Sequence, residues 1–204
     1  MESAAIRIVL LCQILIVPTI FSTEYPCTQD ITPTKNFQPN EYFKGIWYLT
    51  SAEHTYSSDR SDLCEESSME VLQCGDVIRQ NTSEYIGYVK RFLHSEILIF
   101  LSDFDDGLGE YTSVHKYLNK YTPTYQQLQL IPTTIIATDY DNYSVIYTCQ
   151  DVSGQQNGNF LVLKRSMYDE SKDDEINKKL SAYGMDYSKF ISRNHVNCPK
   201  DPDF

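Results

Sequence analysis

The only tryptophan of the chain lies in the segment that most constrains the fold. The segment from Tyr42 to Thr50 places Gly45 before Trp47 and then alternates apolar and polar side chains, which predicts a strand. A glycine there lets a large ring approach the backbone closely. A buried tryptophan covers a large area and needs a partner for its N–H. We interpret Trp47 as the seal at the narrow end of a β-barrel, although a tryptophan in the core of any other β-sheet would leave the same pattern.

The middle of the chain is composed of short strand-like stretches separated by turn residues. Together with the strand that begins near Gly45 they make eight strands at short spacing, which is typical of a closed up-and-down barrel or of a sandwich. His94 and Ser95 leave room only for a tight hairpin, Gly75 suggests a bulge and Pro132 a bend. The other seven strands are expected over residues 68–78, 84–93, 96–103, 110–118, 125–138, 143–150 and 159–165.

One amphipathic helix is expected after the strands. Ser171 predicts its N-cap, and Asp174 three residues later completes a capping box. Ile176 and Leu180 fall on one face, and Gly184 ends the helix. A single helix with one apolar face after eight strands predicts packing against the outside of the barrel.

The N-terminus has the features of a secretion signal. Arg7 precedes an apolar run from Ile8 to Phe21 that is too short to span a bilayer. We expect residues 1–22 to be a signal peptide and residues 23–204 to form one domain, which is secreted and soluble.

Composition narrows the classes of partner. The formal net charge of −11 argues against nucleic acid and against anionic membrane surfaces. It is compatible with a cationic ligand or a basic protein partner, and it also serves simple solubility. The 16 tyrosines suit a pocket for an amphipathic ligand and equally suit exposed strand surfaces.

Five cysteines follow the expected signal peptide, so an odd thiol is left over in a chain that should form disulfides. Cys27 and Cys198 lie near the two ends of the mature chain, and we expect each to staple a chain end to the wall. None of the cysteines has zinc-like spacing, and we expect no metal site.

Three separated motifs resemble the signature of the lipocalins. A glycine and a tryptophan mark the first strand, a Thr-Asp-Tyr triplet marks a late turn, and an arginine ends the last strand, where it would stack on the tryptophan. The resemblance covers nearly the whole mature chain and implies an all-β, eight-stranded antiparallel barrel with one C-terminal α-helix outside. The matching residues are Gly45, Trp47, Thr138, Asp139, Tyr140 and Arg165.

Two segments, 42–48 and 186–192, resemble more narrowly the salivary lipocalins of blood-feeding triatomine bugs, which include the triabin, pallidipin and nitrophorin groups. This resemblance implies secretion into saliva and a binding protein rather than an enzyme. No Ser/His/Asp or Cys/His grouping and no glycine-rich phosphate loop is visible, which also argues against catalysis.

The cysteine plan is also similar to that group, and it implies the pairs Cys27–Cys149 and Cys64–Cys198. Cys74 departs from the plan, because relatives with a third bridge need a sixth cysteine. We expect Cys74 to be a buried free thiol or to pair between molecules.

Strand alternation selects residues for the cavity, although it does not fix which face points inward. An inward Lys90 or Arg79 would suit a fatty-acid carboxylate, whereas inward acids would suit an amine. The residues that we expect to approach the cavity and its ligand are Tyr48, Tyr88, Lys90, Phe92 and Tyr147.

A long polar loop at residues 51–67 is expected at the barrel mouth, opposite Trp47. A loop of that length in a compact domain is typically functional or mobile. Its acidic side chains, among them Asp59, Asp62 and Glu65, either attract a cation or are simply solvated.

The histidines argue against a haem cofactor. A nitrophorin-like site needs an imidazole that projects from a wall strand, and the corresponding second-strand region, residues 68–80, contains none. His115 lies on a strand and could face inward, but a surface or core position is expected.

These observations predict a secreted salivary protein that sequesters a small host mediator, namely an eicosanoid, a biogenic amine or ADP, and so inhibits platelet aggregation. The alternative is a triabin-like inhibitor of a clotting protease such as thrombin, and a haem-based nitric oxide carrier is the third possibility. We expect a monomer, with Asn81 as the candidate glycosylation site.

Overall fold

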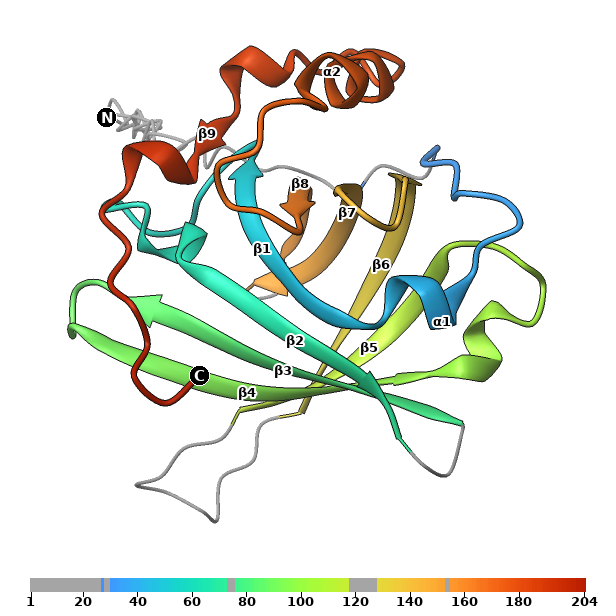
Figure 1. The fold of residues 1–204 in the computed structure, drawn as a ribbon, viewed down its shortest axis with the longest axis horizontal. Helices are drawn as coiled ribbons and strands as arrows, with labels where there is room; N and C mark the ends of the chain where they lie inside the picture. Colours follow the sequence, from blue (N-terminus) through green and yellow to red (C-terminus); the bar gives the residue numbers. More distant parts are fainter. Residues whose placement is uncertain (1–26, 28–29, 73–75, 118–127, 153–154) are drawn as a thin grey trace, which may run out of the picture.

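The computed structural model describes residues 27, 30–72, 76–117, 128–152 and 155–204. The predicted signal peptide, Cys74 and the bulge at Gly75 lie outside these residues. The described chain forms a closed antiparallel barrel with a helix beside it (Figure 1). None of the described helices is long and apolar enough to cross a membrane.

Eight strands form the wall, and each pairs with the next along the chain until the first strand closes the circle. The order in the sheet is β2-β3-β4-β5-β6-β7-β8-β1, with an additional pairing of β2 with β1 and a short strand, β9, at the edge of β1. The strands are β1 (Gly45–Ala52), β2 (Glu65–Val71), β3 (Val77–Ile86), β4 (Arg91–Phe100), β5 (Glu110–Tyr117), β6 (Leu128–Thr138), β7 (Tyr143–Val152), β8 (Gln155–Lys164) and β9 (Ile191–Ser192).

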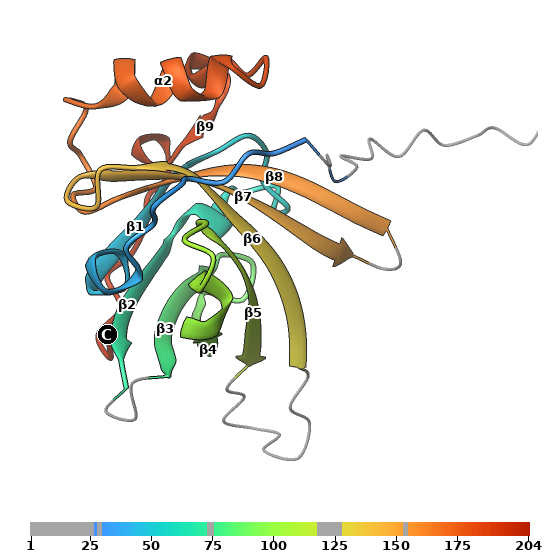
Figure 2. The same cartoon turned by 90° about the vertical axis from the view of Figure 1, so that its right-hand side faces the viewer.

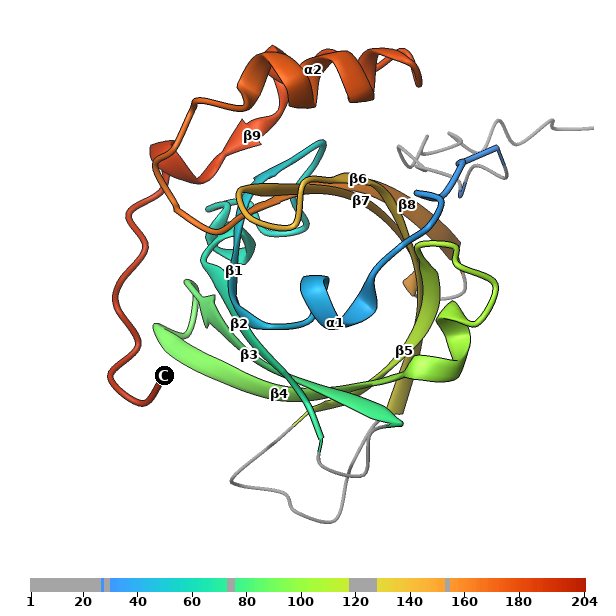
Figure 3. The ribbon, with the colours of Figure 1, turned by 45° about the vertical axis from the view of Figure 1, so that its right-hand side comes forward.

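The helical elements close one end of the barrel and flank its wall. The short helix α1 crosses the closed end (Figure 3), and α2 lies over the outer side of β6, β7 and β8 (Figure 2). The α-helices are α1 (Pro39–Tyr42) and α2 (Asp173–Ser181), and the 3-10 turns are η1 (Ser61–Leu63), η2 (Leu101–Phe104), η3 (Tyr187–Lys189) and η4 (Arg193–His195).

The second, third and fourth strands differ from the sequence-based prediction. The hairpin turn between β3 and β4 is at residues 87–90, and not at His94 and Ser95, which lie inside β4. The N–H groups of Val89 and Lys90 donate to the carbonyls of Ile86 and Gly87 in this turn, and a Cβ at Gly87 would come within 1.9 Å of a carboxylate oxygen of Asp59. The expected strand 84–93 is therefore two strands and a turn, and the expected strand 68–78 spans the end of β2 and the start of β3.

Trp47 closes the barrel as the sequence predicted. Its indole is 1% exposed, and its N–H donates to the Tyr42 carbonyl at 3.1 Å. The guanidinium carbon of Arg165 lies 3.6 Å from the centre of the Trp47 ring, within cation–π range. Arg165 also donates to the carbonyls of Tyr42, Lys44, Ile46 and Tyr140, so that one side chain joins three segments of the closed end.

The Thr-Asp-Tyr triplet forms the turn between β6 and β7 at the same end. The Thr138 hydroxyl donates to the Tyr143 carbonyl at 2.7 Å and accepts from the Tyr140 N–H at 2.9 Å. One Asp139 carboxylate oxygen accepts from the N–H groups of Asn142 and Tyr143. Tyr140 adopts φ 68°, and these bonds hold it in that left-handed conformation.

The helix α2 packs on the wall through the face that the sequence predicted. Ile176 and Leu180 are fully buried against Val145 and Val162 of the barrel exterior. Its start is different from the prediction: Lys172 is the N-cap residue, without a side-chain cap hydrogen bond, while the Ser171 N–H donates to Asp169. Three acidic residues in the first turn interact favourably with the helix dipole in place of a cap.

Two disulfides connect the chain ends to the wall. Cys27 pairs with Cys149 on β7, and Cys64, which precedes β2, pairs with Cys198 of the C-terminal segment. These are the pairs that the family resemblance implied. Beyond Cys198, the buried Asp201 carboxylate accepts from Ser83 and lies 2.7 Å from the His94 imidazole, which keeps the tail on the outside of β3 and β4.

We predict that Arg165→Ala lowers the free energy of unfolding by about 2–4 kcal/mol, because charge-assisted bonds to backbone carbonyls and the stacked indole are lost together. Chemical denaturation measures the change. The matched control is Arg79→Ala, which breaks an ion pair with Glu70 on the barrel surface and should cost under about 1 kcal/mol. Equal losses in the two variants would show that Arg165 does not hold the closed end.

Candidate functional site

The barrel encloses a cavity that runs from Trp47 to the loop after β1. Its deep part has a volume of about 110 Å³ and its outer part about 260 Å³. Eight side chains line both parts, so the two adjoin as one continuous space. The shared lining residues are Leu49, Glu65, Ile97, His115, Ile131, Thr148, Gln150 and Leu161.

Two carboxylates face each other across neighbouring strands near the cavity mouth. Glu65 on β2 is the direct partner of Glu84 on β3, and Asp62 of η1 lines the same part of the cavity. Like charges directly opposite each other destabilise an antiparallel pair. Such an unfavourable arrangement inside a cavity is typical of a functional site.

The surroundings hold protons on this carboxylate pair. Burial raises the pKa of Glu65 to about 7, although the charge of Arg193 and a hydrogen bond with Ser67 oppose the shift. Burial, followed by the charges of Glu65 and Asp62, raises the pKa of Glu84 to about 8. Near neutral pH the pair therefore carries less than its full negative charge, and a cation placed beside it would favour full ionisation.

In the described part of the chain, no positively charged side chain lines the cavity opposite the pair. Among the described residues, neither lysine nor arginine lines the deep or the outer part. Arg193 donates to the backbone carbonyls of Leu63 and Glu65, and its guanidinium lies 5.9 Å from the ring of Tyr48 on the outer face. The cavity thus offers negative charge without an internal counter-ion.

Between the carboxylates and Trp47 the wall is polar on two sides; we call these residues the polar girdle. On one side, Gln80 donates to Ser67 at 3.0 Å, and the hydroxyls of Ser67 and Thr82 lie 3.0 Å apart. On the other side, the Ser113 hydroxyl lies 2.9 Å from the His115 Nε2 atom. The girdle consists of Ser67, Gln80, Thr82, Ser113, His115, Thr133, Thr148 and Gln150.

His115 lies in the cavity wall, and the expectation of a surface or core position is corrected. Burial lowers its pKa to about 4, so the imidazole is neutral at physiological pH. A neutral ring has one donor and one acceptor nitrogen. It therefore does not oppose a cationic ligand.

The five residues predicted to approach the cavity all lie elsewhere. Tyr88 is 84% exposed and Lys90 is also exposed, because both belong to the β3–β4 turn. Phe92 packs on Tyr85, with ring centres 5.2 Å apart, and does not line the cavity.

Tyr48 and Tyr147 point to the outside of the barrel. Tyr48 lies beside Arg193, and Tyr147 packs with Phe160 in the cluster beneath α2. The predictions for Tyr48 and Tyr147 were wrong because each assigned the outward face of its strand to the cavity. The signal that fixes the face was available for β1: because Trp47 seals the interior, Leu49 points inward with it and Tyr48 points outward.

The residues near His115 do not form a haem site. A porphyrin needs a broad, flat, largely apolar slot beside its axial ligand. The space next to His115 is instead narrow and bounded by the polar girdle, and the carboxylates of Glu65 and Glu84 would face the propionates of a haem with like charge. We therefore derive no function through haem.

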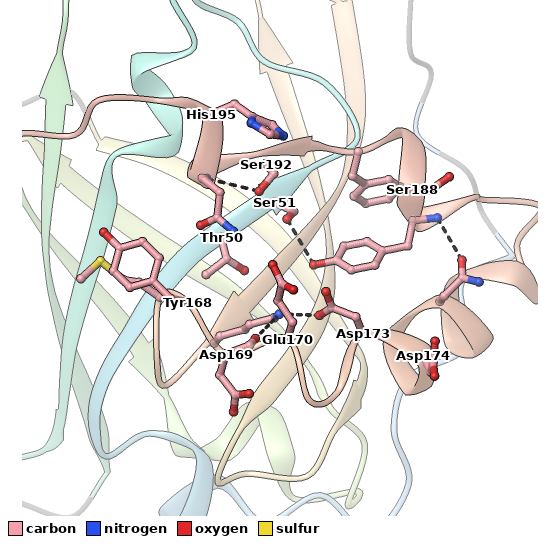
Figure 4. Close-up of a pocket in the computed structure, with 16 residues that line it drawn as sticks. Thr50, Ser51, Tyr168, Asp169, Glu170, Asp173, Asp174, Ser188, Ser192 and His195 are labelled. Carbon is pink, nitrogen blue, oxygen red and sulfur yellow. Dashed lines mark hydrogen bonds and ion pairs between the residues drawn. The ribbon is translucent and has the colours of Figure 1, made fainter.

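A second hollow of about 370 Å³ lies outside the barrel, between the wall, α2 and the C-terminal segment. Asp169, Glu170 and Asp173 lie along one side of it, and Ser192 and His195 along the other (Figure 4). The buried Lys164 in this hollow donates at 2.5 Å to the Asp169 carbonyl and to an Asp173 carboxylate oxygen. These contacts tie the helix to the wall, so we place the functional site inside the barrel.

Comparisons with known proteins agree with this geometry. The model of the family described as Nitrophorin matches residues 27–204. Triafestin-2 of Triatoma infestans is 25% identical over an alignment of 197 positions, and the match covers 88% of this chain and 87% of that protein.

Solved structures show the same fold. The tryptamine complex of the amine-binding protein of Rhodnius prolixus has a TM-score of 0.73 and 21% identity, and the match covers 87% of this chain and 92% of that one. A mutant of LTBP1 in complex with leukotriene C4 has a TM-score of 0.57 and 18% identity, with 87% and 99% covered. The predicted eight-stranded lipocalin barrel is thereby confirmed.

We predict that the stability of this protein falls as the pH rises through the range of the carboxylate pair. The pKa values of Glu65 and Glu84 in the folded state, about 7 and about 8, lie above the ordinary value of 4.5. The folded state therefore keeps protons that the unfolded state releases, and the stabilisation is complete below pH 4.5 and is lost as the pH rises through 7 and 8.

In the variant Glu84→Gln this loss should be smaller, and its melting temperature at alkaline pH should exceed that of the wild type by about 2–4 °C. Thermal unfolding followed by circular dichroism across the pH range measures it. The control Glu70→Gln changes an exposed residue of β2 and should follow the wild-type profile. An alkaline melting temperature of Glu84→Gln below the wild-type value would contradict the assignment.

Proposed function

This chain belongs to the nitrophorin family, and we propose that it is a secreted salivary lipocalin that sequesters a small cationic amine of the host. The resemblance to triatomine salivary lipocalins, stated above from the sequence, is confirmed by the family and by the relative from Triatoma infestans. A secreted protein of this kind acts by stoichiometry. It would lower the free concentration of a biogenic amine and so reduce platelet aggregation.

The observation that carries the proposal is the pair of carboxylates inside the barrel. Glu65 and Glu84 are unfavourable neighbours for each other, and Asp62 adds a third acid in the same part of the cavity. An ammonium group between them would relieve the repulsion and make charge-assisted hydrogen bonds, which are stronger than neutral ones. The apolar floor beyond, with Trp47 and Leu49, suits the ring of an aromatic amine.

Anionic mediators fit the cavity poorly. An eicosanoid carboxylate or the phosphates of ADP would need a lysine or arginine, and the two candidates from the sequence lie outside. Arg79 pairs with Glu70 on the surface, and Lys90 is in the exposed turn. Two carboxylates would repel either class of ligand.

The remaining alternative is an inhibitor of a clotting protease, in which outer loops bind the enzyme and the cavity is incidental. A barrel filled by its own side chains would favour that function. Here the interior contains a continuous cavity with charged and polar groups, whose burial is costly unless a ligand uses them. The cavity therefore favours sequestration.

We predict that the purified protein binds tryptamine in isothermal titration calorimetry, and that Glu84→Gln and Glu65→Gln each weaken binding by about 10–100-fold. The range follows from the loss of one charge-assisted contact. Glu70→Gln, an exposed residue of the same strand as Glu65, should leave the affinity unchanged. Binding of leukotriene C4 or ADP with no detectable binding of amines would contradict the proposal. Inhibition of thrombin would favour the alternative of a clotting-protease inhibitor.

We also predict that amine binding releases protons near neutral pH and weakens as the pH falls below about 7. The bound ammonium favours the ionised carboxylates, and therefore lowers the pKa values of Glu65 and Glu84 from about 7 and about 8. Titrations in two buffers of different ionisation enthalpy measure the released protons. An affinity that does not change from pH 5 to pH 8 would exclude this pair as the ammonium site. The other titratable groups that face the pair or line its part of the cavity are Asp62, His54, Tyr56, His115 and Arg193.

A further inference from the structure

We infer that the polar girdle recognises a hydroxyl group on the ring of the bound amine, so that the ligand class is the hydroxylated aromatic amines. The inference rests on the proposed amine function and names the chemistry at the other end of the ligand. The girdle residues that carry the inference are Ser113 and His115 of β5, which lie deeper in the cavity than Glu84.

The position of the girdle follows from the lining of the two cavity parts. Glu84 lines only the outer part, Trp47 and Ser113 only the deep part, and His115 both. A ligand whose ammonium lies at Glu65 and Glu84, and whose ring points away from the mouth, therefore extends past His115 toward Trp47. The far edge of that ring meets Ser113 and Thr133 before it reaches the apolar floor.

The two sides of the girdle differ in what they leave for a ligand. Gln80 Nε2 donates to Ser67 at 3.0 Å and to Thr82 at 3.3 Å, and these two hydroxyls lie 3.0 Å apart, so each of the three side chains has a partner within the wall. On the opposite side the Ser113 hydroxyl lies 3.1 Å from the Ile131 carbonyl, to which it donates, and 2.9 Å from His115 Nε2. Within the described part of the chain, the hydrogen bond of the His115 ring is the one between Nε2 and Ser113, and it does not involve the other ring nitrogen, Nδ1.

The chemistry of the imidazole matches a hydroxyl. If Ser113 donates to Ile131, then His115 Nε2–H donates to Ser113 and Nδ1 is an acceptor; in the other tautomer Nδ1–H is a donor. A phenolic hydroxyl can donate or accept, so it satisfies either state. A ring without a hydroxyl would cover these polar groups and leave them unpaired, and sites built for a hydroxyl discriminate strongly against such analogues.

The test compares tryptamine with 5-hydroxytryptamine, two ligands that differ by one hydroxyl, in calorimetric titrations of the full chain at pH 8. We expect 5-hydroxytryptamine to bind at least about 10-fold more tightly, the effect of one buried hydrogen bond. In Ser113→Ala and in His115→Phe this ratio should fall toward one while tryptamine binds at least as tightly as before. Thr112→Val, which changes an exposed residue of the same strand, β5, should keep the wild-type ratio.

The outcomes separate this inference from the proposed function. Tight binding of both amines in a ratio near one overturns the inference and leaves amine sequestration standing. A wild-type ratio that survives in both Ser113→Ala and His115→Phe overturns the role of these residues. If neither amine binds, the proposed function fails and this inference fails with it. Ser113→Ala removes one oxygen atom and so gives a result even if His115→Phe does not fold.

Discussion

The stacking of Arg165 on Trp47 is the interaction on which the rest of the structure depends. The guanidinium lies 3.6 Å from the indole centre and also donates to carbonyls before β1, on β1 and in the β6–β7 turn. It thereby fixes the end of β8 to the start of β1, which are the strands that must meet for the barrel to close. Because this end is filled, the interior has a floor, and in the part of the barrel that the structure describes a ligand enters past the loops at the other end.

The barrel interior above that floor is lined by polar and acidic side chains, unlike an ordinary protein core. A core of this size is normally apolar, yet here Glu65 and Glu84 face each other and a girdle of hydroxyl, amide and imidazole groups lies below them. The protein tolerates this because burial keeps protons on the acids and off His115, so few net charges are buried at once. An apolar cluster around Trp47 and a second one beneath α2 supply the stability that the cavity does not.

Much of the fold could be predicted from the sequence, but little of the site. Trp47, Arg165 and the helix face of Ile176 and Leu180 are recognisable because each is set by strong local patterns or by a motif. The hairpin at residues 87–90 was missed because Tyr88, Lys90 and Phe92 alternate as they would in a strand, whereas the turn is placed by the pairing along the whole of β3 and β4. The acidic loop before β2 was noticed as a possible cation site, but its partner Glu84 could be identified only after the register of β2 and β3 was known.

The wrong prediction for the inward face of β7 has a physical cause, which is the helix packed on the outside of the barrel. On β7, Tyr147 was expected to approach the cavity, and Tyr143 lies on the same, more aromatic face of the strand. That face instead packs beneath α2, which needs a large apolar surface outside the barrel. The alternate residues Ser144, Ile146 and Thr148 are left to the interior, and Thr148 belongs to the polar girdle. The external helix therefore makes a polar cavity possible, because it gives the tyrosine-rich face of β7 an apolar partner outside the barrel.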